Sequence, residues 1–248
     1  MTSPTFAVAL LILTCFAGQA RGAPADDLIS AVMKGRYVAG YVSARHCWLY
    51  VDKEYGRYCV KPLKSEWVES GDRRRLYLLT SGVPINADGT IDDLPAHVLP
   101  GLVGAFALVK GLDGKPRYLA ATDALMFGSF GASGARSARL TAIGPSDYYA
   151  WVFSSGGTWQ GISVGSYNIL APRGDKFVDV STIPVMREDD QAHSYDIAFD
   201  SSKSDRRVFP LIVTKQREVR GKRLKPVVDR FVVPFNLRTW RYEMPRNH

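Results

Sequence analysis

Cysteine and histidine are scarce in this chain, and the few that occur are not spaced as metal ligands. The 248 residues include only 3 Cys and 4 His. No two histidines stand four residues apart, and no C-x-x-C motif occurs. His46, Cys47 and Cys59 lie close together but lack a fourth ligand nearby, which a structural zinc site requires. We therefore expect no metal site, no dithiol exchange and no cofactor.

Motifs for nucleotides and calcium are also missing. The stretch GLDGKP lacks the first glycine of a P-loop and has Pro116 where Ser or Thr would bind magnesium. The glycines of GSFGASG are spaced by three, not as in a dinucleotide-binding turn. In INADGTIDDL, a calcium loop with Gly89 at its sixth position would need Pro84 and Pro95 as ligands, so a hairpin turn is expected.

Only one long apolar run occurs, and it lies at the N-terminus. The run from Phe6 to Phe16 is followed by Gly18 and Ala20, a pattern typical of a signal peptide over residues 1–20, cleaved after Ala20 or Ala23. Cys15 raises the alternative of lipidation, but Thr14 stands where lipoprotein signals have a small residue. Without a second apolar run, we expect no transmembrane anchor in a soluble, extracytoplasmic mature protein.

Two cysteines remain after such cleavage, and in an oxidising compartment they predict a disulfide between Cys47 and Cys59. Folding HCWLYVDKEYGRYC about Lys53 would place Cys47 opposite Cys59 and Trp48 opposite Tyr58. The short signal and the absence of any N-x-S/T sequon favour a bacterial, periplasmic protein.

Strand signals dominate the rest of the chain. PADDLISAVMKG, residues 24–35, predicts one short helix with a single apolar stripe. Short segments rich in aromatic and β-branched residues then recur every 10 to 15 residues, separated by turn residues. Hairpin turns are expected at GLDGK, SSGG and VRGK. The pattern predicts a mainly all-β fold, arranged as an antiparallel sandwich, a barrel or a small propeller.

The glycine-rich stretch at 128–140 is the expected boundary or long loop. It would separate an N-terminal β-rich half, residues 21–127 with the disulfide, from a C-terminal β-rich half, residues 141–248. One continuous domain with a glycine-rich crossover is the alternative.

Basic residues outnumber acidic ones by 32 to 24, which gives a net charge of +8. The run KQREVRGKRLK, read as a hairpin tip, gathers six candidate anion-binding residues: Lys215, Arg217, Arg220, Lys222, Arg223 and Lys225. A solvated edge that resists aggregation is the other interpretation. For an exported protein, the expected partner is an anionic envelope component or an acidic protein, and no nucleic acid is expected.

One catalytic motif needs consideration. GISVG fits G-x-S-x-G with Ser163 at its centre, and Asp179 and His193 follow in the order of a hydrolase triad. A strand and a turn follow it, however, where the motif requires a helix. The aromatic cluster near SSGG is expected to pack the sheet rather than bind sugars. We therefore expect a non-catalytic binding or interaction protein of the cell envelope, with a serine hydrolase centred on Ser163 as the alternative.

Overall fold

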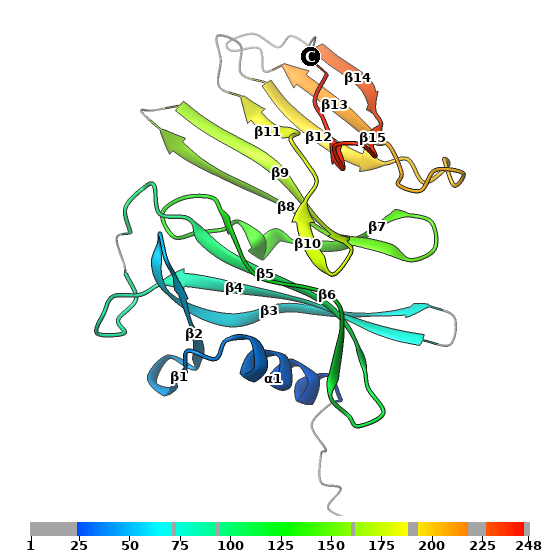
Figure 1. The fold of residues 1–248 in the computed structure, drawn as a ribbon. Coiled ribbons are helices and arrows are strands. Elements are labelled where there is room, and N and C mark those ends of the chain that lie inside the picture. Colours follow the sequence, from blue (N-terminus) through cyan, green and yellow to red (C-terminus); the bar gives the residue numbers. More distant parts are fainter. Residues whose placement is uncertain are drawn as a thin grey trace, which may run out of the picture.

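The computed structural model describes residues 24–70, 73–92, 95–159, 162–187, 193–217 and 227–245. The expected signal peptide and most of the basic run lie outside these residues. One α-helix precedes an array of antiparallel strands (Figure 1), which confirms the all-β prediction with one short helix. None of the described helices has the length and hydropathy of a membrane-spanning helix.

The helix α1 (Pro24–Arg36) is where the sequence predicts it. The buried Leu28, Val32 and Met33 form its apolar stripe and pack on one face of the first sheet. That sheet has the linear strand order β1-β2-β3-β4-β5-β6. The bounds of its strands are β1 Tyr41–Val42, β2 Cys47–Asp52, β3 Gly56–Ser70, β4 Arg73–Pro84, β5 Gly101–Lys110 and β6 Pro116–Phe127.

The second sheet has the order β14-β13-β12-β11-β9-β8-β7, with β10 paired to β9. Its strands are β7 Arg139–Gly144, β8 Tyr148–Trp159, β9 Ile162–Arg173, β10 Lys176–Asp179, β11 Pro184–Arg187, β12 His193–Phe199, β13 Leu211–Arg217 and β14 Val227–Val233. A small hairpin of β15 (Phe235–Asn236) and β16 (Arg241–Tyr242) follows. Because neither large sheet closes on itself in the described residues, the sandwich is the arrangement that fits.

The two sheets share a core, so the fold is layered as helix, sheet, sheet and C-terminal hairpin (Figure 1). Leu79 and Val103 of the first sheet meet Trp151 and Phe153 of the second in one buried cluster. Strand β5 is buried on both faces, since Phe106 and Leu108 turn towards α1 while Val103 turns towards the second sheet. Whether the halves fold as one unit or two stays a prediction.

The disulfide between Cys47 and Cys59 is present, with a Cα separation of 5.4 Å. The predicted register was wrong, however. Leu49 lies opposite Cys59, so the disulfide joins diagonal neighbours on the face that β2 and β3 share. The Asp52 carboxylate accepts hydrogen bonds from the backbone N–H groups of Glu54 and Tyr55, which centres the turn on Glu54 rather than Lys53.

Of the three hairpin turns that the sequence predicts, one is confirmed, one is wrong and one lies outside the described residues. GLDGK joins β5 to β6, with the Gly111 N–H donating to the Lys115 carbonyl. SSGG is not a turn, because β8 continues through residues 154–157 and pairs with β9. Gly156 lies opposite Gly165, and a Cβ on Gly156 would stand 2.4 Å from the Val164 carbonyl oxygen. These glycines therefore permit close strand contact. VRGK, at 219–222, lies outside the described residues.

Candidate functional site

The three residues of the hydrolase hypothesis are not assembled into a triad. Ser163 pairs with Thr158 near one end of β9, whereas Asp179 pairs with Leu170, seven positions further along the same strand. At the rise of an extended strand, seven positions correspond to roughly 23 Å. His193 begins β12, two strands away from β9. A nucleophile and its acid must be linked through the base by hydrogen bonds, and this register separates them.

Asp179 has a structural partner set instead. Its carboxylate accepts hydrogen bonds from the Asn168 side-chain amide at 2.9 Å and from the backbone N–H groups of Ile169 and Ser181 at 3.0 and 3.1 Å. Burial raises the pKa of Asp179, while these three hydrogen bonds act in the opposite direction. Ser155 donates to the same Asn168 at 2.6 Å, so the carboxylate anchors a network that joins β8, β9 and β10.

Most of the basic run cannot be placed, because residues 218–226 lie outside the described part. Lys215 is on β13, opposite Asp229 of β14, and its Nζ lies 5.9 Å from the centre of the Tyr195 ring. The backbone of Arg217 pairs with Val227. The anion-binding role of Arg220, Lys222, Arg223 and Lys225 stays a prediction.

A cleft of about 940 Å³ lies elsewhere, at an open end of the space between the sheets. Along β4 the face that meets the second sheet runs from the buried Leu79 to Ser81 and then to the exposed Val83. On β3 the matching positions are Lys61, opposite Ser81, and Cys59, opposite Val83. The cleft is thus a continuation of the dry core where the second sheet no longer covers the first.

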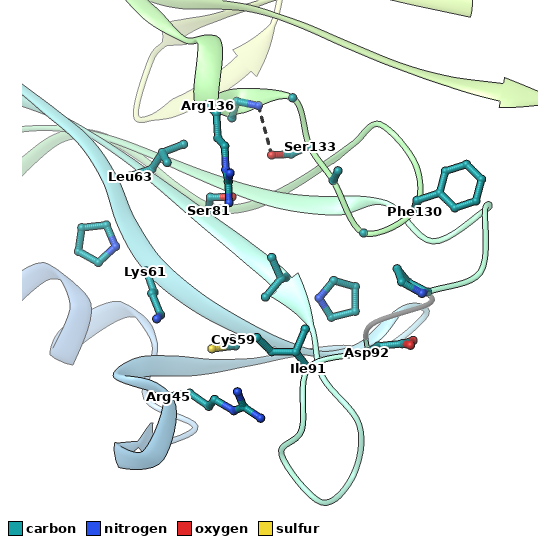
Figure 2. A pocket seen from close by; sticks show the side chains of 18 of the residues that line it. Arg45, Cys59, Lys61, Leu63, Ser81, Ile91, Asp92, Phe130, Ser133 and Arg136 are labelled. Carbon is teal, nitrogen blue, oxygen red and sulfur yellow. Dashed lines mark hydrogen bonds between the residues drawn. The ribbon is translucent and has the colours of Figure 1, made fainter. Parts of the chain in front are cut away.

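Three cations line this cleft, and each comes from a different segment (Figure 2). Arg45 ends the short 3-10 helix η1 (Ser43–Arg45), two positions before the disulfide-bonded Cys47. Lys61 projects from β3, and Arg136 lies on a second 3-10 helix, η2 (Ala135–Ser137). All three side chains are exposed. Among the described residues, one acid, Asp92, also lines the cleft, so these lining side chains have an excess of positive charge.

The rest of the lining is largely apolar. The residues between the charged groups are Pro62, Leu63, Val83, Pro84, Ile91 and Pro95. An apolar floor with a few charged groups around it is typical of sites for small amphiphilic ligands. The disulfide helps to form this floor, since Cys59 is one of the lining residues.

The segment from Gly128 to Ala138, between β6 and β7, forms one wall of the cleft. Gly128, Gly131 and Gly134 all have φ near +70°, a conformation that favours glycine. A Cβ on Gly134 would stand 2.1 Å from the Ser154 carbonyl oxygen, so the wall packs directly on β8. Lys64 also holds this wall, because its Nζ donates to the Ala138 carbonyl at 2.6 Å.

A groove of about 530 Å³ adjoins the cleft on the other side of this wall. Small residues line it, among them Ser129, Ser155, Gly156, Gly157 and Gly165. Phe130 lines both the groove and the cleft, and its side chain is 52% exposed. Its φ of 51° is unusual for an aromatic residue, and the neighbouring Gly128 and Gly131 also have positive φ.

Of the aromatic cluster, Trp151 and Phe153 are buried in the shared core, as the packing interpretation predicts. The described residues contain no group of three or more His, Cys, Asp or Glu placed to hold a metal ion. Sequence reasoning identified none of Arg45, Lys61 and Arg136, and the only signal near them was the glycine-rich stretch. Comparisons of the chain with protein-family models, with curated proteins and with solved structures gave no match.

Proposed function

We propose that this protein is an exported, non-catalytic binding protein of the cell envelope, and that it takes an anionic ligand with an apolar body into the cleft. The observation that supports the proposal is the convergence of Arg45, Lys61 and Arg136, from three separate segments, around an apolar floor. Cations that share a concave, partly apolar site add their fields and attract an anion more strongly than cations scattered over a surface.

The test uses two fluorescent probes of similar shape and different charge. 8-Anilinonaphthalene-1-sulfonate is an anion with an apolar body, and N-phenyl-1-naphthylamine is its neutral counterpart. We expect the wild-type protein to bind the sulfonate more tightly than the amine, and to lose that preference as salt rises. Each of Arg45→Gln, Lys61→Gln and Arg136→Gln should weaken sulfonate binding by about two- to fivefold, because partly exposed charges contribute modestly.

Lys53→Gln provides a matched control, since it removes one exposed cation from the β2–β3 turn, outside the cleft. It should leave the affinity for both probes unchanged. If the variant lacking all three cleft cations retains the wild-type preference for the sulfonate, the anion is bound elsewhere and the proposal fails.

Export is tested separately. The chain, expressed with its native N-terminus in a bacterium, should be released by osmotic shock and should begin at Arg21 or Pro24. Retention in the cytoplasm with Met1 in place would contradict the proposed location. Because the register separates Ser163 from Asp179, we also expect no labelling by a fluorophosphonate probe.

A further inference from the structure

A second cavity, of about 720 Å³, lies at the other end of strand β8 from the groove. Tyr148, the first residue of β8, lines this cavity, whereas Ser155, seven positions further on, lines the groove. That interval corresponds to roughly 23 Å along an extended strand. None of the residues that line the cleft lines this cavity.

Four segments far apart in the sequence form its walls. They are the β7–β8 turn with Ser146, the end of β9 with Arg173, the loop after β12 with Arg207, and the turn between β15 and β16 with Trp240. Two of the lining residues are arginines, and none of the described residues that line the cavity is acidic.

The indole of Trp240 positions both arginines. The guanidinium carbon of Arg207 lies 5.2 Å from the centre of the Trp240 ring, and that of Arg173 lies 5.5 Å from it. Both distances are within the range of a cation–π interaction. The ring itself is fixed by an edge contact with Phe235, at 5.4 Å between ring centres. Trp240 thus holds two like charges against a single ring, and both of them line the same cavity.

The backbone that carries these side chains is held by packing and hydrogen bonds. The Tyr148 hydroxyl donates to the Pro172 carbonyl at 2.7 Å, directly before Arg173. The Phe209 N–H donates to the Ile143 carbonyl at 2.7 Å, which docks the loop of Arg207 on β7. A site held in this way is largely formed before a ligand arrives, so binding loses little conformational entropy.

Unusual backbone geometry is concentrated around the cavity. Five non-glycine residues of the described chain have a positive φ, and Ser146, Asp147 and Trp240 are three of them, with φ of 58°, 60° and 59°. Ser146 and Trp240 line the cavity directly. Strained conformations persist where the surrounding structure enforces them, and they are frequent at binding sites.

The two guanidinium groups have no carboxylate partner among the described residues. Neither Arg173 nor Arg207 is in a salt bridge there, whereas their neighbour Arg206 lies 3.6 Å from the carboxylate of Asp205. A guanidinium group stacked on a ring keeps N–H donors at its edge, and these match the oxygens of carboxylate and phosphate groups.

We propose that Arg173 and Arg207, held by Trp240, form a second binding site, for the phosphate group of a small phosphomonoester. A phosphomonoester carries a charge of about −1.5 to −2 at neutral pH, which matches two cations better than a carboxylate does. The cavity is larger than a bare phosphate ion needs, which leaves room for the organic part of the ligand. This site uses no residue of the cleft and does not depend on the function proposed for it.

The experiment measures binding of glycerol 3-phosphate, inorganic phosphate and acetate by calorimetry and by tryptophan fluorescence. We expect glycerol 3-phosphate to bind most tightly and acetate to bind weakest. Arg173→Gln and Arg207→Gln should each weaken phosphate binding by about tenfold, since each removes charge-assisted hydrogen bonds. Arg206→Gln is the matched control, because this neighbour of Arg207 does not line the cavity. The control variant should bind phosphate with the affinity of the wild-type protein.

A Trp240→Phe variant identifies the source of the fluorescence signal, and it should remove the ligand-induced change while circular dichroism shows an intact fold. Binding unaffected by both glutamine variants would overturn the proposal, as would acetate binding as tight as that of phosphate. Absence of saturable binding of either phosphate ligand to the wild-type protein would overturn it as well. The variant that lacks the three cleft cations should bind phosphate normally, which separates this site from the cleft.

Discussion

Reducing the disulfide between Cys47 and Cys59 is the perturbation whose effect on stability can be worked out most directly. Both cysteines are almost fully buried, at 0% and 3% exposure, beside Leu49 and Ile85. Reduction breaks one covalent bond and removes no heavy atom from the chain. It therefore tests the cross-link without creating a cavity, which a substitution to alanine would do.

The expected magnitude follows from the length of the closed loop. The two cysteines are 12 positions apart, and the chain-entropy model gives about 3 kcal/mol for a loop of this size. A domain of this length has a urea m-value of roughly 2 to 3 kcal/mol/M, so the midpoint should fall by about 1 to 1.5 M. The reduced protein should remain folded in water, since the stability of most domains exceeds about 5 kcal/mol.

The assay is urea unfolding followed by tryptophan fluorescence, with and without a thiol reductant. The Cys47→Ala, Cys59→Ala double variant is the control, because its midpoint should not respond to the reductant. An unchanged midpoint in the reduced wild-type protein would refute the entropic reasoning. Two free thiols in exported, unreduced protein would refute the prediction that the bond forms in the compartment of export.

Three further outcomes test the interpretation of single residues. Asp179→Ala should destabilise the fold by about 3 kcal/mol in urea unfolding, because three hydrogen-bond donors lose their acceptor. Asp179→Asn should cost less than about 1 kcal/mol, since the Asn168 amide can rotate to match the new amide. Equal effects of the two variants would contradict this. Gly134→Ala should lower the free energy of unfolding by about 3 kcal/mol or more, because the new Cβ would contact the Ser154 carbonyl. Gly89→Ala should lower it by about 1 kcal/mol, since Gly89 has a similar φ but no atom close to its Cβ position. Burial raises the pKa of Tyr58 and of Tyr148 to about 12, above the unfolded value of about 10. As the pH rises, the tyrosines of the unfolded chain therefore lose their protons first, and the free energy of unfolding should fall between about pH 10 and 12. Urea midpoints that stay constant over this pH range would refute the prediction.

The fold class could be predicted from the sequence because most strands carry a local signal. Strand β5 is a run of apolar residues bounded by Gly101 and Lys110, and the turn after it has its own glycines. The part of β3 that follows Cys59 has no such local signal, for a physical reason. It places Lys61, Lys64 and Glu66 along its length, and Pro62 adjoins a bulge in its pairing with β4. A proline and alternating charges argue against a strand locally, and only the neighbouring strands stabilise one here.

The wrong turn and the wrong register both come from local signals with two meanings. A Gly-Gly pair suits a tight hairpin turn, but it also suits a strand whose backbone is approached closely, as Gly156 is by Val164. For the disulfide hairpin, the signal for the true register was present. Asp52 followed by Gly56, whose φ is +84°, indicates a turn centred between these two residues. The predicted register instead placed the two cysteines directly opposite each other.

The cations of the cleft could not be predicted, because charge density along the chain differs from charge density in space. In a strand, successive side chains point to opposite faces, so a continuous basic run divides its charges between two surfaces. Lys215 shows the effect, since it packs over Tyr195 on one face while the next residue, Gln216, turns to the other. Arg45, Lys61 and Arg136 are isolated in sequence, yet the fold directs them at one volume. Since Coulomb attraction depends on distance, three converging charges act on a ligand more strongly than a longer run spread over both faces. The density of basic residues along the sequence therefore indicates solubility and general attraction to anions, and only the tertiary arrangement indicates where a particular anion would be held.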